Sequence, residues 1–134
     1  MNSVQVYFVG AGPGDPDLIT VKGRKLLEEA DVVIYAGSLV NPAILAVTPA
    51  GCEIHNSASM TLDEVIAVMK AAVEQGKKVI RLHTGDPSIY GAIQEQIDLL
   101  NWKSAVKWCR VSVRFWQRRR RWVRSILCRA CPRR

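Results

Sequence analysis

The sequence predicts an α/β domain with a mostly parallel sheet and flanking helices, and two observations support this. In residues 1–100, four short strand-like runs alternate with segments of helical periodicity, joined by short connections. Such alternation gives parallel strands with helices packed on the sheet faces. Two loops rich in glycine or proline, residues 10–16 and 84–87, also directly follow predicted strands. Ligands of these sheets bind at the carboxyl ends of strands, so we expect the two loops to be neighbours at one site.

The strands are predicted from short apolar runs that stop at turn-forming or polar residues. The first run, VQVYFV, ends at Gly10 and lacks polar alternation, which indicates a strand buried on both faces. The second run, DVVIY, is followed by Ala-Gly-Ser. The predicted strands are residues 4–9, 31–35, 52–55 and 78–82.

Two helices are indicated by their capping residues. Thr61 and Glu64 have the spacing of a capping box, which opens an amphipathic helix that runs to Gly76, a typical residue just past a helix end. Asn41 and Pro42 suit the cap and first position of a short helix.

Two further helices are predicted from apolar periodicity. Residues 18–30 repeat apolar side chains at helical spacing, with Asp17 as the expected cap. Residues 89–100 carry Ile93, Ile97 and Leu100 on one stripe.

Charge divides the chain sharply at residue 100. Residues 1–100 carry a net charge of −5, and residues 101–134 carry +12 with no acidic residue, which together give the net +7 of the chain. All four tryptophans also follow residue 100. We therefore predict one domain, residues 1–100, and a basic Arg/Trp-rich tail, residues 101–134, that is not a domain.

The tail has the composition expected of an out-of-frame translation. Alanine codons of the type GCG become arginine codons of the type CGG when they are read one base later. Residues 109–116 permit Val-Pro-Gly-Val-Ser-Ser-Phe-Leu in the other frame, and residues 117–121 permit a run of alanines. On this hypothesis the second domain of the protein is absent and the chain is truncated and inactive. Reading the coding DNA around codon 100 tests it.

The first loop, GAGPGDP, differs from a dinucleotide fingerprint because Asp15 stands where the last glycine belongs. A loop that cradles pyrophosphate offers N–H donors and positive charge, whereas Pro13 and Pro16 remove donors and Asp15 adds negative charge. The loop therefore suits an uncharged or cationic ligand. A tight turn without a ligand explains the same residues equally well.

The second loop leads into the segment HTGDPSIYG. Gly85 would let the backbone approach a ligand closely. Asp86 could accept hydrogen bonds from a ribose, or cap the next helix with Pro87 at its first position. Capping alone explains Asp86 and Pro87, but not the Thr84-Gly85 pair before them.

Three blocks together resemble the tetrapyrrole methylase family: VGAGPGDPDLIT at residues 9–20, ADVVIY at residues 30–35 and GDPSIYG at residues 85–91. The resemblance covers residues 1–100 and implies the N-terminal domain of a two-domain, S-adenosylmethionine-dependent methyltransferase. It implies that the cofactor lies between the domains and that longer members form homodimers. The residues that it implies for cofactor binding are Pro13, Thr84, Gly85, Asp86 and Ile89.

Residues 35–40, YAGSLV, resemble the branch of the family that methylates C11 of precorrin-4 or cobalt-precorrin-4 in cobalamin biosynthesis. The uroporphyrinogen-III branch instead has Asp-Arg-Leu after the tyrosine, where Ala36 and Gly37 stand here. The implied reaction is attack of the ring carbon on the sulfonium methyl group, which needs no nucleophilic side chain. No catalytic residue is assigned, and Tyr35 and His83 are the first positions to test. His55 and His83 are either acid–base groups or ordinary strand-end residues.

Other functions remain open at this point. An α/β binding module with a basic nucleic-acid-binding arm would fit the tail, and a steep salt dependence of DNA binding would support it. A non-functional fragment is a third reading. Cys128 and Cys131 have C-x-x-C spacing, but a zinc site lacks further ligands nearby, so we expect no metal. We expect a cytoplasmic protein without membrane contact, since the start lacks a signal peptide and no apolar run reaches the ~20 residues of a membrane span.

Overall fold

The computed structural model describes residues 6–37, 39–85, 93–100 and 106–109 of the 134-residue chain. They form a five-stranded, fully parallel sheet of order β3-β2-β4-β1-β5. The strands are β1 (Val6–Gly10), β2 (Val32–Tyr35), β3 (Glu53–Asn56), β4 (Val79–His83) and β5 (Val106–Cys109). The predicted parallel α/β fold is therefore confirmed.

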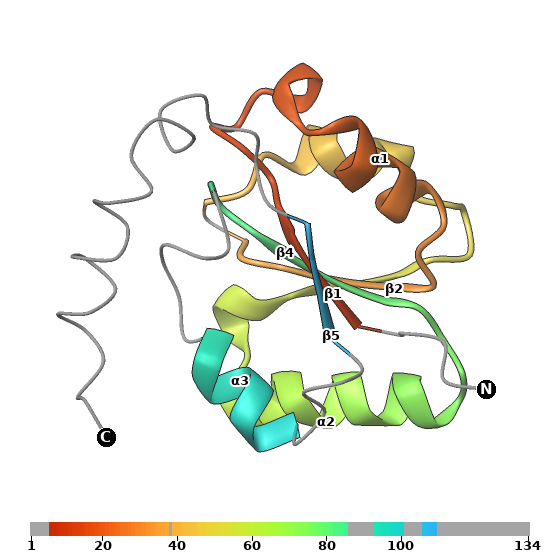
Figure 1. Ribbon diagram of the computed structural model, residues 1–134, viewed down its shortest axis with the longest axis vertical. Helices are drawn as coiled ribbons and strands as arrows, with labels where there is room; N and C mark the ends of the chain where they lie inside the picture. Colours follow the sequence, from red (N-terminus) through yellow and green to blue (C-terminus); the bar gives the residue numbers. More distant parts are fainter. Residues whose placement is uncertain (1–5, 38, 86–92, 101–105, 110–134) are drawn as a thin grey trace, which may run out of the picture.

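The sheet forms the middle of three layers (Figure 1). Helix α1 (Val21–Glu28) and the 3₁₀ helix η2 (Pro42–Val47) cover one face, and α2 (Leu62–Glu74) and α3 (Ile93–Leu100) cover the other. Two short 3₁₀ turns, η1 (Pro16–Leu18) and η3 (Ser57–Ser59), lie in the connections.

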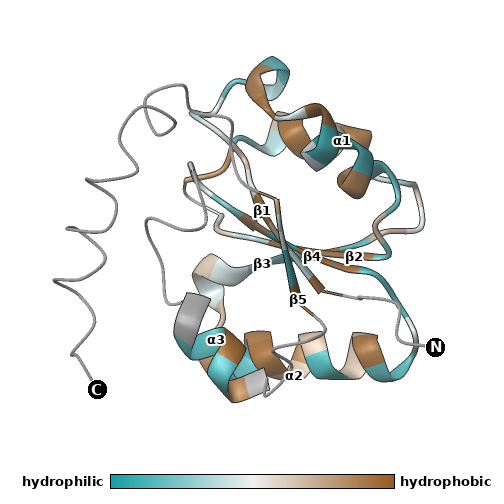
Figure 2. Cartoon of the chain, in the orientation of Figure 1, coloured by the Kyte–Doolittle hydropathy of each residue, from teal (hydrophilic) through white to brown (hydrophobic). Residues whose placement is uncertain are grey.

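The three central strands are apolar along most of their length, as the colouring of Figure 2 shows. Alternate residues of each strand enter the two cores, so Phe8 packs toward α2 and Val9 packs toward α1. Phe8, Met69 and Leu27 are among the fully buried side chains. Burial of both faces explains why these runs lack the polar alternation of a half-exposed strand.

The predicted caps are largely present. Thr61 and Glu64 make both hydrogen bonds of the capping box of α2, and Gly76 follows that helix with φ of 73°. Asn41 caps η2, which is a 3₁₀ helix rather than an α-helix.

The helix predicted for residues 18–30 begins later than expected. Asp15, not Asp17, caps the short turn η1, and the Oγ1 of Thr20 accepts the Gly23 N–H to cap α1. The proline at position 16 fits the first position of a turn, and the extended backbone of Ile19 and Thr20 separates that turn from the helix.

The described structure also adds a strand that the sequence did not indicate. Val106–Cys109, which we had assigned to the tail, pairs with β1 as edge strand β5. Trp108 is 37% exposed and stacks on Phe8 with ring centroids 5.6 Å apart. The boundary at residue 100 stays a prediction, as does the out-of-frame hypothesis. Trp102, Trp116, Trp122, Cys128 and Cys131 lie outside the described residues.

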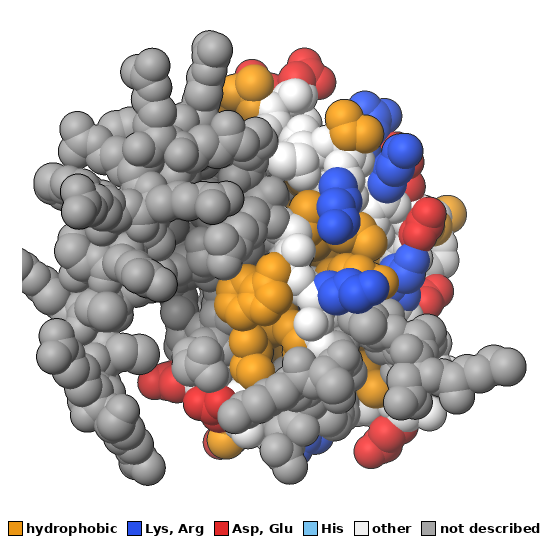
Figure 3. Space-filling view, viewed as in Figure 1, with side chains coloured by type: hydrophobic (Ala, Val, Ile, Leu, Met, Phe, Trp, Pro, Cys, Tyr) orange, Lys and Arg blue, Asp and Glu red, His pale blue; other side chains and the backbone are white. Residues whose placement is uncertain are grey.

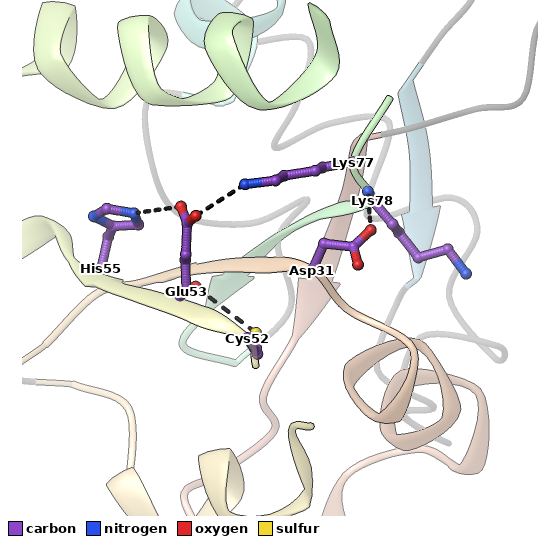
Figure 4. A network of polar contacts seen from close by, with 6 residues as sticks. All are labelled: Asp31, Cys52, Glu53, His55, Lys77 and Lys78. Atoms are coloured by element: carbon purple, nitrogen blue, oxygen red, sulfur yellow. Dashed lines mark hydrogen bonds and ion pairs between the residues drawn. The ribbon is translucent and has the colours of Figure 1, made fainter. Parts of the chain in front are cut away.

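A polar network joins the amino ends of three strands (Figure 4). The Glu53 carboxylate receives Lys77 Nζ at 2.9 Å and lies 3.8 Å from the Nε2 of His55. Asp31 accepts the backbone N–H of Lys78 at 2.7 Å. His55 thus belongs to this network on edge strand β3, which favours the structural reading of that residue over an acid–base role.

Charged side chains on the described surface are mixed in sign, with blue and red groups side by side in Figure 3. Arg24 pairs with Glu28, and Lys78 pairs with Glu29. These exposed pairs contribute little to stability, typically below about 1 kcal/mol each. Among the described helices, none has the length and apolar character needed to cross a bilayer.

Candidate functional site

The two glycine loops meet at the carboxyl edge of the sheet, as the sequence predicted. The backbone of Gly12 and the backbone of Gly85 exchange hydrogen bonds of 3.4 and 3.1 Å, and Ala11 N–H donates to the carbonyl of His83 at 2.7 Å. These bonds extend the pairing of β1 with β4 beyond the ends of both strands. The loops therefore form one rigid platform rather than two separate turns.

Glycine is needed at the point where the loops meet. Gly12 and Gly85 have φ angles of 74° and 61°, in the left-handed region that costs other residues roughly 1–2 kcal/mol. Among the described residues, which stop at Gly85 and resume at Ile93, no atom lies within 4 Å of a Cβ built on Gly85. None of these residues prevents a ligand from approaching the backbone of Gly85 on that side.

The first loop is held from a second direction by Asn41. Its Nδ2 donates to the carbonyl of Gly14 at 2.9 Å, while its Oδ1 caps η2. Sequence analysis identified the capping role only, because the partner is 27 positions away. The same residue thus ties the connection after β2 to the loop after β1.

The predicted cofactor residues fall into two groups. Pro13 is exposed on the first loop, and Thr84 and Gly85 are partly buried on the second. The hydroxyl oxygen of Thr84 is buried and has no hydrogen-bond partner in the described part of the chain. A buried hydroxyl without a partner is costly, so this atom is a candidate ligand contact. Asp86 and Ile89 lie outside the described residues.

His83 lies at the end of β4, directly before this loop. It is buried and stacks against Phe8 with ring centroids 5.8 Å apart, and none of the described residues makes a hydrogen bond with its Nε2. Burial, with a smaller contribution from the charge of Arg81, lowers the pKa of His83 to about 4. The imidazole is therefore neutral at physiological pH and cannot attract an anion by charge.

Arg81, two residues earlier, is a buried cation held by neutral groups. Its Nη1 donates to the carbonyl of Ile34 at 3.2 Å, and its Nε donates to the Oε1 of Gln96 at 3.4 Å. Burial lowers its pKa to about 10, which still leaves it charged near neutral pH. Through these bonds Arg81 connects β4, which leads into the second loop, with β2 and α3.

Tyr35, the other residue considered for catalysis, ends β2 and is partly buried. Its carbonyl accepts the hydroxyl of Ser57 at 3.0 Å, which fastens the end of β2 to the start of η3. Tyr35 pairs with Leu82, so it stands one strand away from the loop that contains Thr84 and Gly85. The sequence did not single out Ser57 or its neighbour Asn56, although Asn56 ends β3 at the same sheet edge and Ser57 directly follows it.

The arrangement suits a ligand without phosphate. The platform offers glycine backbone, a hydroxyl and a proline ring, and residues 10–16 contain no lysine or arginine. In the described residues, no group of three or more His, Cys, Asp or Glu side chains is placed to hold a metal ion. Residues 110–134, on which the nucleic-acid alternative depends, lie outside the described part.

The described residues thus form a parallel α/β domain in which two glycine loops meet at the carboxyl edge of the sheet. Residues 5–108 match the family model of the tetrapyrrole (corrin/porphyrin) methylases. The chain therefore belongs to the tetrapyrrole methylase family, as the sequence motifs indicated.

Individual relatives agree with this family assignment. The cobalt-precorrin-4 C(11)-methyltransferase of Methanocaldococcus jannaschii is 66% identical over 100 residues, which cover 75% of this chain and 39% of the relative. The X-ray structure of the cobalt-precorrin-4 methyltransferase CbiF has a TM-score of 0.76 at 48% identity, covering 81% of this chain and 46% of CbiF. A uroporphyrin-III C-methyltransferase from Thermus thermophilus in complex with S-adenosyl homocysteine has a TM-score of 0.65 at 32% identity, covering 84% of this chain and 46% of that one. The chain thus spans less than half the length of these proteins.

Proposed function

We propose that this chain forms the S-adenosylmethionine-binding part of a methyltransferase that acts on C11 of precorrin-4 or cobalt-precorrin-4. The observation that supports this most directly is the pair of hydrogen bonds between Gly12 and Gly85, which joins the two family motifs into one platform. The high identity to a cobalt-precorrin-4 C(11)-methyltransferase favours this substrate over other tetrapyrroles.

The described residues fit the proposed cofactor. Thr84 provides a buried hydroxyl without a partner among the described residues, which can hydrogen-bond a polar group of the ligand. No described residue occupies the space where a side chain of Gly85 would stand, so the ligand can lie against its backbone. Pro13 adds an exposed apolar ring on the neighbouring loop. With Asp86 and Ile89, these residues form the proposed cofactor site.

The main contribution of the protein is then alignment. S-adenosylmethionine supplies an already activated methyl group when it is bound. The linked loops hold the backbone around it rigid, which keeps the reacting groups in line and excludes unproductive orientations. His83 stays neutral beside the loop and therefore does not repel a sulfonium.

A pair of glycine substitutions tests the cofactor site. Gly85 and Gly76 have similar positive φ angles, 61° and 73°, and a Cβ on either would meet no atom within 4 Å. Gly85→Ala and Gly76→Ala should therefore both lower the free energy of unfolding by about 1 kcal/mol through backbone strain. Only Gly85→Ala should weaken the binding of S-adenosylhomocysteine, by about tenfold, when titration calorimetry compares both variants with the unsubstituted chain.

The two variants separate a binding effect from a stability effect. Gly76 lies at the end of α2, at the amino side of β4, whereas Gly85 lies at the carboxyl side. Equal affinity of the two variants for S-adenosylhomocysteine would contradict the proposed site, and no measurable binding by the unsubstituted chain would contradict a cofactor function of the chain as a whole.

A further inference from the structure

A second feature of the carboxyl edge lies at the ends of β2 and β3, where the side-chain amide of Asn56 covers Gly37. A Cβ on Gly37 would come within 1.9 Å of the Oδ1, 2.3 Å of the Nδ2 and 2.4 Å of the Cγ of Asn56. Real Cβ atoms do not approach other atoms so closely. Position 37 can carry a side chain only if the Asn56 amide moves away.

The amide has a fixed orientation. The Oδ1 of Asn56 accepts the backbone N–H of Ala58 at 2.9 Å, which leaves the Nδ2 as the donor end of the amide. The segment is also anchored by Ser57, whose hydroxyl donates to the carbonyl of Tyr35. Asn56 is exposed, and no acceptor for its Nδ2 is present among the described residues. The amide that lies over Gly37 therefore keeps its N–H donors available to a ligand at this sheet edge.

The position of this donor relative to the cofactor platform is set by the sheet. Strand β3 is two strands away from β4, and parallel strands lie about 4.8 Å apart. The ends of β3 and β4 are therefore separated by about 10 Å along the carboxyl edge. A small ligand on Gly12 and Gly85 would not reach Asn56, but a large planar ring placed beside it would extend over β2 toward β3.

We propose that Asn56 binds a peripheral carboxylate of the tetrapyrrole through its Nδ2, and that Gly37 is required because it makes room for this amide. This inference rests on the proposed function, which supplies a substrate rich in carboxylates. A neutral amide donates to a carboxylate without needing a counter-ion when no ligand is bound. Asn56 is therefore a substrate-positioning residue, and Gly37 acts through it.

Nuclear magnetic resonance on the ¹⁵N-labelled full chain tests the contact directly. The probe is uroporphyrin III, a polycarboxylate tetrapyrrole. It is used at about 0.5 M salt, where screening shortens the range of non-specific attraction to basic residues to a few ångström. The side-chain NH₂ signals of Asn56, assigned by their loss in Asn56→Ala, should shift with the probe concentration. Those of the exposed Gln75, at the end of α2, should not.

The dissociation constants of variants measure how much the Asn56 amide contributes to the binding of uroporphyrin III. Asn56→Ala should weaken uroporphyrin III binding by about tenfold, as expected for loss of a hydrogen bond to a charged group. Asn56→Asp keeps the shape of the side chain but adds negative charge, so it should weaken binding further. Gln75→Ala, which removes an exposed amide elsewhere, should leave the dissociation constant unchanged.

Gly37 is tested by a double-mutant cycle. Gly37→Ala should displace the Asn56 amide and weaken the binding of uroporphyrin III as much as Asn56→Ala does. The double variant should then bind the probe with the same affinity as either single variant. The double variant also removes the clash, so its folding should be close to that of Asn56→Ala. Additive losses would overturn the view that Gly37 acts through Asn56.

The remaining outcomes separate this inference from the proposed function. Unchanged Asn56 signals, or equal binding of the probe by Asn56→Ala and the unsubstituted chain, would overturn the inference. Binding of S-adenosylhomocysteine without any binding of uroporphyrin III would also overturn it, while the cofactor function would stand. Failure to bind S-adenosylhomocysteine would instead contradict the proposed function.

Discussion

A polypeptide of these 134 residues alone is expected to transfer methyl groups to precorrin-4 at least about 10⁵-fold more slowly than a longer relative. The chain spans 39% of the Methanocaldococcus jannaschii enzyme, and the family resemblance places the cofactor between two domains. The described platform of Gly12 and Gly85 would then contact one side of the cofactor only. Alignment of the reacting groups lowers the activation barrier by roughly 7–11 kcal/mol, and a site that contacts only one side of the cofactor cannot maintain this alignment.

The assay compares two proteins with labelled S-adenosylmethionine and precorrin-4. One is the 134-residue chain, and the other joins its residues 1–108, the extent of the family match, to the remaining part of the Methanocaldococcus jannaschii relative. Activity of the joined protein alone would support both the substrate and the need for a second domain. Similar turnover by the two proteins would refute that need. Binding of tetrapyrrole by itself is no test, because residues 101–134 carry a charge of +12 and attract anions unspecifically.

Much of the fold could be predicted because local signals and the global fold agree in residues 1–100. Each predicted strand lies within two residues of the observed one. For β1, β2 and β4 the reason is that a strand buried on both faces leaves a continuous apolar run, whereas β3 is mostly exposed and has no such run. The start of α2 could be predicted because the capping box at Thr61 depends only on residues close together in the sequence. The neighbouring position of the two glycine loops followed from the rule that parallel strands end at one edge, and the structure confirms it.

The missed features depend on contacts between distant segments. Asn56 meets Gly37 across 19 positions, and Asn41 meets the first loop across 27, so neither contact leaves a periodic pattern. Strand β5 was missed because the arginine- and tryptophan-rich composition around it outweighed four residues of which only Cys109 is fully buried. Its pairing with β1 provides the partner that makes this short run a strand.

His83 is expected to make the protein markedly less stable in mild acid. Its pKa is about 4 in the folded chain, chiefly because of burial, whereas an unfolded chain has the ordinary value of 6.5. Between these values the unfolded state binds a proton that the folded state does not, so stability is fully present above pH 6.5 and falls as the pH drops toward 4. At about 1.4 kcal/mol per pH unit, the loss between pH 7 and pH 4.5 is about 2–3 kcal/mol.

Urea unfolding at pH 7 and pH 4.5 measures this loss, and substitution of each histidine assigns it. In His83→Phe the ring can still stack on Phe8 but cannot take up a proton, so the difference between the two pH values should shrink by about 2–3 kcal/mol. His55→Asn removes the other histidine of the chain, which lies in the Glu53 network on β3, and should retain most of the difference. The pKa of Glu64 is lowered chiefly by its hydrogen bonds with Thr61, so Glu64 titrates at lower pH and contributes equally to all three proteins. The pKa of Glu53 is lowered chiefly by Lys77 and to a smaller extent by His55, so His55→Asn changes the contribution of Glu53 only slightly. If His83→Phe loses as much stability in acid as the unsubstituted chain, the imidazole is not held neutral by burial, and its place beside the cofactor platform must be explained in another way.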